Sequence, residues 1–159
     1  MSHARIQSHL LASLALTMST TFFAPAYGDS PIHQNDDVLG RWRLTRMLDA
    51  SNITALDDKE AARLIGKIFL VEPDKVSLDG EICDEPGFER HYEDTVRYLR
   101  EEAHASSWKL GLPSNVTVVD LSCTEALIKG YDKIVILWKG VFFDAVRLDP
   151  MMHRQKTKR

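Results

Sequence analysis

The sequence lacks the short motifs that mark the common classes of enzyme. It contains no G-x-S-x-G, no P-loop and no G-x-G-x-x-G, which are typical of hydrolases, NTPases and dinucleotide-binding enzymes. It also contains no C-x-x-C, C-x-x-C-H or H-E-x-x-H, the patterns of the commonest thioredoxin-type, covalent-haem and zinc sites. The motifs therefore predict no catalytic residue, no metal ligand and no cofactor.

Histidines are few and scattered. After residue 26 only His33, His91, His104 and His153 remain. No two of them have the spacing of metal ligands, and an isolated histidine is more often a surface residue than a catalyst. We therefore expect no histidine-based metal site.

Long apolar runs are also scarce, and the one that exists lies at the start of the chain. Arg5 is the only full positive charge before it, the apolar centre spans Leu10–Phe23, and Ala24-Pro25-Ala26 follows. A charged start, a short apolar centre and a small-residue exit are the parts of a secretory signal. The stretch is too short and too rich in Ser and Thr for a stable membrane span, which needs about 20 apolar residues.

Residues 1–26 are accordingly predicted to be a cleavable signal peptide. Cleavage is expected after Ala26, with Gly28 as the alternative, and no cysteine follows to take a lipid anchor. The competing interpretations are a permanent anchor or a buried core helix. Export predicts a periplasmic or secreted protein, bacterial in origin, with no integral membrane segment after cleavage.

An excess of basic residues is missing as well. The formal net charge is −3, and loss of Arg5 with the signal changes it from −3 to −4. Nucleic-acid binders usually have a basic face, so we expect no nucleic-acid partner.

One segment of the chain is strongly acidic. Between residues 72 and 94 the acidic residues are Glu72, Asp74, Asp79, Glu81, Asp84, Glu85, Glu89, Glu93 and Asp94. Their spacing is not that of a calcium loop, and a solvated acidic face able to steer a basic partner is the better interpretation.

There are only two cysteines, Cys83 and Cys123. In an oxidising compartment such a pair predicts one disulfide, which by loop entropy stabilises the fold by about 4 kcal/mol. A thiol nucleophile or a metal site is the alternative. Neither cysteine has a second Cys or a His at ligand spacing, which favours the disulfide.

The remaining chain divides into three parts. Residues 27–38 are polar and predict a flexible leader, residues 39–149 predict a single domain, and residues 150–159 predict a disordered basic tail. A mature chain of about 130 residues fits one domain with its own core.

Hydrophobic periodicity predicts mainly strands within that domain. The expected strands cover residues 40–48, 67–71, 76–78, 116–123, 133–138 and 141–148, with irregular structure and at most one edge strand over 81–93. Asp57 with Glu60 forms a capping box for a helix ending at Gly66, and Asp94 caps a second helix reaching about Ala105. The fold class is therefore mainly β (α+β): an antiparallel, closed or nearly closed barrel of about 6–8 strands with two short helices.

One motif resembles a known family. Gly40-Arg41-Trp42 opens the first strand and Arg147 lies near the end of the last, which resembles lipocalin-like barrels. In those proteins an arginine late in the barrel packs across the tryptophan of G-x-W. The resemblance implies that Trp42 and Arg147 form a structural pair at the barrel end, and that the protein binds rather than catalyses. This chain is shorter, has a helix between the first two strands, and lacks a long helix after the barrel. Small exported bacterial protease and lysozyme inhibitors with barrel folds and one disulfide are a second partial likeness.

Asp144 lies near Arg147 but on the opposite strand face by parity. One of the two is expected to be buried or at a barrel mouth. A buried charge needs a partner, and Asp120 and Glu60 are the candidates.

These observations leave three functional hypotheses. The leading one is a non-enzymatic binding or inhibitor-like protein acting on a protein partner in the bacterial envelope. Its candidate contact region comes from the loops around 79–93 and 106–115: Asp84, Glu85, Phe88, His91 and Trp108. One alternative is a carrier of a small apolar ligand in a hollow barrel, and the other is an enzyme of unrecognised type that uses Asp or Glu with an Arg.

Overall fold

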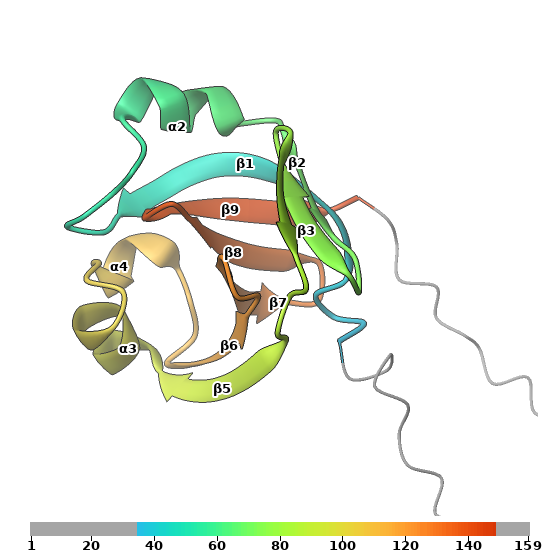
Figure 1. The fold of residues 1–159 in the computed structure, drawn as a ribbon. Helices are drawn as coiled ribbons and strands as arrows, with labels where there is room; N and C mark the ends of the chain where they lie inside the picture. Colours follow the sequence, from blue (N-terminus) through green and yellow to red (C-terminus); the bar gives the residue numbers. More distant parts are fainter. Residues whose placement is uncertain (1–34, 149–159) are drawn as a thin grey trace, which may run out of the picture.

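The computed structural model describes residues 35–148 (Figure 1). The predicted signal peptide, the start of the predicted leader and the predicted basic tail lie outside these residues. Within this range no helix is long and apolar enough to span a membrane.

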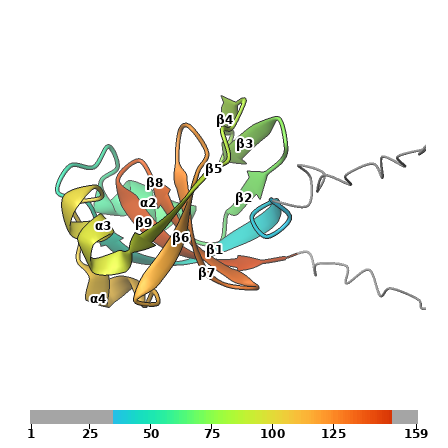
Figure 2. The same ribbon diagram turned by 90° about the horizontal axis from the view of Figure 1, so that it is seen from below.

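Nine antiparallel strands form one sheet, which curls into a half-barrel (Figures 1 and 2). Its order is β4-β3-β2-β1-β9-β8-β7-β6-β5. The strands are β1 (Gly40–Ala50), β2 (Ile68–Val71), β3 (Lys75–Leu78), β4 (Glu81–Asp84), β5 (Glu89–Asp94), β6 (Asn115–Asp120), β7 (Glu125–Gly130), β8 (Lys133–Trp138) and β9 (Val141–Arg147). The prediction of a mainly β, antiparallel fold is confirmed. The prediction of a closed or nearly closed barrel is wrong, because the sheet is open, and it has more strands than expected.

Strand β1 is the longest strand of the sheet. Its pairing with β9 shifts register twice, between Leu44 and Arg46 and between Met47 and Asp49. Each extra residue on one strand bends it and increases its twist. The first shift reverses the side-chain alternation, so Leu48, expected to share a face with Trp42, packs against the other core.

Three short helices accompany the sheet in the described chain, one more than predicted. They are α2 (Asp58–Leu64), α3 (Thr95–Glu101) and α4 (Ser107–Leu110). The capping box of Asp57 and Glu60 is confirmed, because each side chain accepts from the other residue's backbone N–H, at 2.7 and 2.9 Å. Asp94 caps α3 by accepting from the Arg97 N–H at 2.9 Å. The third helix, α4, is a single turn followed by Gly111 in the left-handed conformation.

Two hydrophobic cores lie on opposite faces of the sheet. On the concave face, residues from both halves of the sheet meet, including Leu78 on β3 and Leu121 after β6, and α2 adds Ala61 and Leu64. On the other face, α3 and α4 cover β6 to β9. That second core consists of Tyr98, Leu99, Ala103, Leu110, Val116, Val118, Leu127, Val135 and Phe142.

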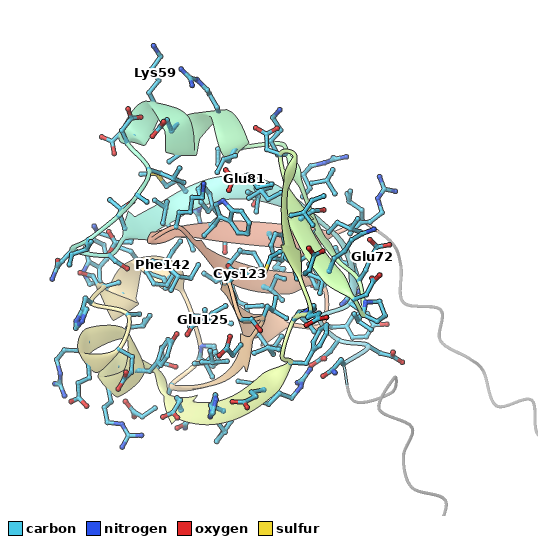
Figure 3. The ribbon with its side chains drawn as sticks, in the orientation of Figure 1. Lys59, Glu72, Glu81, Cys123, Glu125 and Phe142 are labelled. Carbon is cyan, nitrogen blue, oxygen red and sulfur yellow. A yellow bond between two sulfur atoms is a disulfide. The ribbon has the colours of Figure 1, made fainter. Side chains whose placement is uncertain are left out.

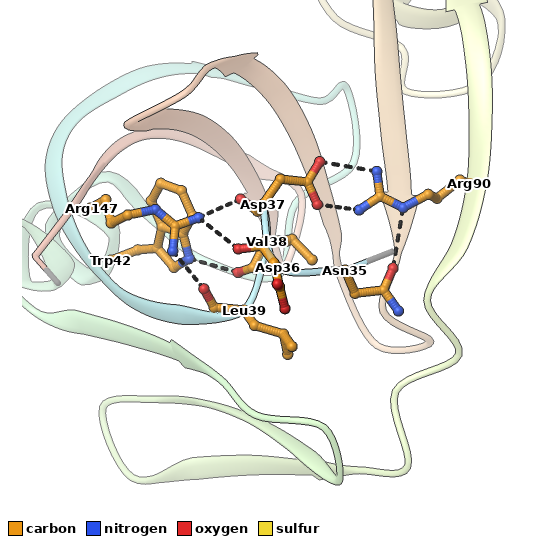
Figure 4. A network of polar contacts seen from close by, with 8 residues as sticks. All are labelled: Asn35, Asp36, Asp37, Val38, Leu39, Trp42, Arg90 and Arg147. Atoms are coloured by element: carbon orange, nitrogen blue, oxygen red, sulfur yellow. Dashed lines mark hydrogen bonds and ion pairs between the residues drawn. The ribbon is translucent and has the colours of Figure 1, made fainter. Parts of the chain in front are cut away.

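A short segment before β1, which we call the N-terminal turn (residues 35–39), closes one end of the half-barrel (Figure 4). Val38 is fully buried, and its carbonyl accepts from the Trp42 indole N–H at 2.8 Å. The Arg147 guanidinium lies 4.0 Å from the centre of the Trp42 ring. It also donates to the carbonyls of Leu39, at 2.6 Å, and Asp37.

The N-terminal turn also reaches the far edge of the sheet. Arg90, on β5, donates to the Asn35 side chain at 3.2 Å and forms an ion pair with Asp37 (Figure 4). Residues 35–38 are the last residues of the predicted leader. They connect β1 and β9 to β5 across the opening of the half-barrel.

The two cysteines connect the sheet at a second place. Cys83 on β4 lies at disulfide distance from Cys123 in the β6–β7 turn, with an S–S separation of 2.09 Å. Beside it, the Gly87 N–H donates to the Ser122 hydroxyl at 2.9 Å. One edge strand, β4, is thereby joined to the opposite half of the sheet, which maintains the curl without closing the barrel.

Replacing both cysteines, Cys83→Ala with Cys123→Ala, is expected to lower the free energy of unfolding. The bond closes a loop with a sequence separation of 40 residues, and removing such a bond typically costs about 2–4 kcal/mol. Urea unfolding of the oxidised protein and of the variant measures the difference. The reduced wild type should match the variant, and equal stability of all three would show that the pair contributes nothing.

The G-x-W glycine is expected to be irreplaceable for a local reason. Gly40 has a φ of +121°, and a Cβ there would lie 3.0 Å from the Arg147 Nη1 atom. Gly40→Ala should lower the free energy of unfolding by about 1–3 kcal/mol. Gly80→Ala is the matched control, because Gly80 also has a positive φ but a Cβ added there would meet nothing within 4 Å. If the two variants lose equal stability in urea, the contact with Arg147 plays no part.

Candidate functional site

A pocket of about 470 Å³ lies where α3 packs beside β5, β6 and β7, and we call it the acidic pocket. Helix α3 and strands β6 and β7 contribute residues to the second core, so these walls are held by packing, whereas β5 is held by its pairing with β6. Its lining residues are His91, Glu93, Arg97, Tyr98, Glu101, Glu102, Val118, Asp120 and Glu125.

Strand register explains why carboxylates far apart in sequence meet here. Asp120 lies directly opposite Glu125 on β7 and opposite Glu89 on β5. Directly paired residues of antiparallel strands share a face, with Cβ atoms about 4.5–5.5 Å apart. Glu125, labelled in Figure 3, therefore projects from the same face of the sheet as Asp120.

The helix supplies the remaining wall. Residues three and four apart on a helix share a face, which brings together Arg97, Tyr98 and Glu101. Glu102 follows as the C-cap residue of α3. Asp94 fixes where the helix begins and thus which of its residues point at the strands.

The electrostatic balance of the acidic pocket is strongly negative. Five carboxylates line it against one guanidinium, a balance of −4 with His91 neutral. The guanidinium of Arg97 is already paired with Glu93, at 2.9 Å. Glu101 is paired with Arg100, at 2.6 Å, although Arg100 does not line the pocket. Glu102, Asp120 and Glu125 face the pocket without a lining cation of their own.

The negative charge of the pocket acts on the Tyr98 hydroxyl. Tyr98 is 7% exposed, and its hydroxyl donates to the Glu125 carboxylate. Burial raises the pKa of Tyr98 well above its ordinary value, and the hydrogen bond to Glu125 and the negative charges of Glu125, Glu102 and Asp120 raise it further. Three of the five carboxylates thus act on the Tyr98 hydroxyl.

The carboxylates surround the pocket without converging on one point. Among residues 35–148 no three His, Cys, Asp or Glu side chains are grouped so as to hold a metal ion. Charges spread over a pocket of this size suit an organic cation, such as the side chain of a lysine or arginine, better than a point charge. The enzyme hypothesis calls for an Asp or Glu that acts together with an Arg. In this pocket the Arg97 guanidinium is paired with Glu93, and the Glu125 carboxylate accepts a hydrogen bond from Tyr98.

The predicted contact residues do not form one surface. His91 lines the acidic pocket, whereas Asp84 ends β4, Glu85 follows it, and Phe88 is partly buried against the concave core. Trp108 lies on α4, which is well separated from β4 (Figure 2). It is 80% exposed, with the Lys109 ammonium 5.6 Å from its ring centre.

Most of the pocket was not predicted from the sequence. Glu101, Glu102, Asp120 and Glu125 lie outside the acidic segment that the sequence singled out. One usable signal was present: Glu89, His91 and Glu93 alternate at the period of a strand, which places polar side chains on one face.

Asp144 and Arg147 each have partners in the structure. Asp144 accepts from Arg46 at 2.7 Å and from Lys129 at 2.8 Å. Arg147, for which the carboxylates of Asp120 and Glu60 were the candidate partners, donates to the carbonyls of Leu39 and Asp37. The Lys129 ammonium also donates to the Leu110 carbonyl at 2.8 Å. This cluster attaches α4 to the sheet, since it connects the last turn of that helix to β7 and β9.

Comparison with known proteins gives no relative. The chain matches no family model, no curated protein and no solved structure. The lipocalin-like resemblance therefore stays a prediction.

The raised pKa of Tyr98 predicts a specific dependence of stability on pH. The native protein keeps the Tyr98 proton above about pH 10, where the unfolded chain releases it, so stability is lost as the pH rises past that value. Relative to Tyr98→Phe, the wild type should lose about 1.4 kcal/mol more between about pH 8 and about pH 11. Urea unfolding at each pH measures this.

Tyr92→Phe is the control for this experiment. Tyr92 is 74% exposed, so its substitution should leave the wild-type pH dependence intact. If Tyr98→Phe and the wild type lose stability in parallel, the hydroxyl is not held as the structure indicates.

Proposed function

We propose that this is an exported, non-enzymatic binding protein, inhibitor-like in action, that holds a basic segment of a protein partner in the bacterial envelope. The observation that carries the proposal is the acidic pocket, in which five carboxylates face one guanidinium. A cavity of this volume lies within the range of ligand sites, which is about 300–1,000 Å³.

The electrostatic arrangement supports a cationic partner in two ways. A concave site lined by one sign of charge focuses the field and speeds the encounter with the opposite charge. Glu102 and Asp120 have no cation opposite them among the pocket residues, so a lysine or arginine side chain would supply the missing partner.

The concave side of the sheet supports protein binding over transport of a small apolar ligand. Trp42, Phe69 and Phe143 are fully buried there, and Trp138 packs edge-on against Phe69 with ring centres 6.1 Å apart. Side chains of the chain itself thus occupy the space that a carrier would leave for its cargo.

Export remains part of the proposal, and the cysteine pair supports it. Disulfides persist in oxidising compartments such as the periplasm, and Cys83 and Cys123 are at bonding distance. The start of the chain has the composition of a secretory signal.

Binding of a labelled basic peptide, Lys-Thr-Lys-Val-Lys-Thr-Lys, tests the proposal by fluorescence anisotropy. The double variant Glu101→Gln with Glu102→Gln should weaken binding about fivefold, because two exposed carboxylates contribute roughly 1 kcal/mol together. Raising the salt from about 50 to about 300 mM should weaken wild-type binding as well.

A second acidic pair provides the matched control. Asp84→Asn with Glu85→Gln removes the same charge outside the pocket and should leave the affinity within about twofold of wild type. The peptide Glu-Thr-Glu-Val-Glu-Thr-Glu should not bind. No measurable binding of the basic peptide, or an equal loss in both double variants, would contradict the proposal.

A further inference from the structure

Strand β5 is one edge of the sheet formed by residues 35–148. Within the described chain β5 pairs only with β6, and β4 forms the opposite edge. An edge strand presents unpaired N–H and C=O groups that can hydrogen-bond to another strand. The edge of β5 borders the acidic pocket directly, because His91 and Glu93 line it.

The hydrogen-bond pattern identifies which backbone groups point outward. The Thr95 N–H donates to the Ser114 carbonyl at 3.0 Å, just beyond the last pair of the β5–β6 ladder. Bonded and non-bonded pairs alternate along an antiparallel ladder, so Glu93, His91 and Glu89 bond to β6. The N–H and C=O groups of Arg90 and Tyr92 therefore face the open edge.

The side chains of β5 divide between two chemically different faces. Glu89, His91 and Glu93 lie on the face of the acidic pocket, since they oppose Asp120, Val118 and Val116. Arg90 and Tyr92 lie on the other face. The Arg90 guanidinium is held by Asp37 in the N-terminal turn, whereas Tyr92 is 74% exposed.

We propose that a basic strand of the partner protein adds antiparallel to the edge of β5. The inference rests on the proposed function and specifies how the basic segment is held. The backbone of the partner bonds to Arg90 and Tyr92. Its basic side chains, at every second position, lie beside Glu89, His91 and Glu93 and reach into the acidic pocket, while apolar side chains between them lie beside Tyr92.

The negative charge of β5 favours a basic strand of a partner protein over the β5 strand of a second copy of the chain. Two β5 strands paired edge to edge would bring Glu89 and Glu93 of one copy beside acidic residues of the other, and like charges across strands are destabilising. The other edge is a poorer site, because β4 has four residues and its Cys83 is tied to the β6–β7 turn.

N-methylated peptides test the backbone contact without changing the protein. In Lys-Thr-Lys-Val-Lys-Thr-Lys added as proposed, the N–H groups of the Val and Thr residues point at β5 and those of the Lys residues point away. N-methylation of Val and one Thr should weaken binding about tenfold or more. N-methylation of two Lys residues is the matched control, and it should leave the affinity within about threefold.

Tyr92→Pro tests the same contact from the side of the protein. Proline removes the outward N–H of residue 92, which does not bond to β6, so β5 stays paired while the edge loses a donor. The peptide should bind about tenfold more weakly than it does to Tyr92→Thr, which keeps the N–H. Circular dichroism and the thermal midpoint of both variants establish that they are folded.

The outcomes separate this proposal from the function on which it rests. If N-methylation of Val and Thr has no effect while Glu101→Gln with Glu102→Gln still weakens binding, strand addition is wrong and the acidic pocket still binds basic segments. If the basic peptide does not bind at all, both proposals fail. If sedimentation shows a dimer that Tyr92→Pro dissociates, the edge belongs to a second copy of the chain, which also overturns strand addition.

Discussion

The packing of Arg147 on Trp42 is the contact on which the arrangement of the half-barrel depends. The guanidinium lies 4.0 Å from the indole centre and donates to carbonyls of the N-terminal turn. A stacked cation of this kind contributes about 0.5–2 kcal/mol, and more where water is excluded. Its structural effect is larger than that figure, because the turn it holds carries Asp37, and Asp37 fixes Arg90 on β5. The first, last and edge strands are therefore positioned together.

An open sheet has consequences that a closed barrel avoids. Bulges in β1 give strong curvature, yet β4 and β5 never pair, so two edges remain. The cysteine pair ties β4 to the β6–β7 turn, and the N-terminal turn reaches only the Arg90 side chain of β5. Unpaired backbone N–H and C=O groups at a sheet edge can hydrogen-bond to another strand, so β5 is the part of the fold most suited to binding one.

Local chemistry made some elements predictable from the sequence. The Asp57–Glu60 capping box and the Asp94 cap act within four residues. Residues 139 and 140, which separate the expected strands 133–138 and 141–148, have the two positive φ angles, 51° and 84°, that a tight hairpin needs. Residues 81–93 predict irregular structure with at most one edge strand, but the structure has β4 and most of β5 there. Strand β5 is hard to predict because its sequence has almost no apolar face and its stability comes from pairing with β6. The open sheet was equally hard to predict from the sequence, because it depends on β-bulges and no residue type indicates how a bulge changes the curvature. The acidic pocket draws on α3, β5, β6 and β7, and only the register connects Asp120 with Glu125.

The acidic side chains of β5 oppose pairing with a second copy of β5 and attract a basic strand, and both effects come from the same negative charge. Charged residues on an edge strand oppose pairing with an identical strand, which protects an open sheet from aggregation. The repulsion depends on the sign of the incoming charge, so a strand with basic residues at alternate positions meets attraction where a copy of β5 meets repulsion. In the proposed complex, Glu89 and Glu93, together with the carboxylates of α3 and β7, would determine which strand the edge accepts. Protection and selectivity do not compete here, because one charge pattern provides both.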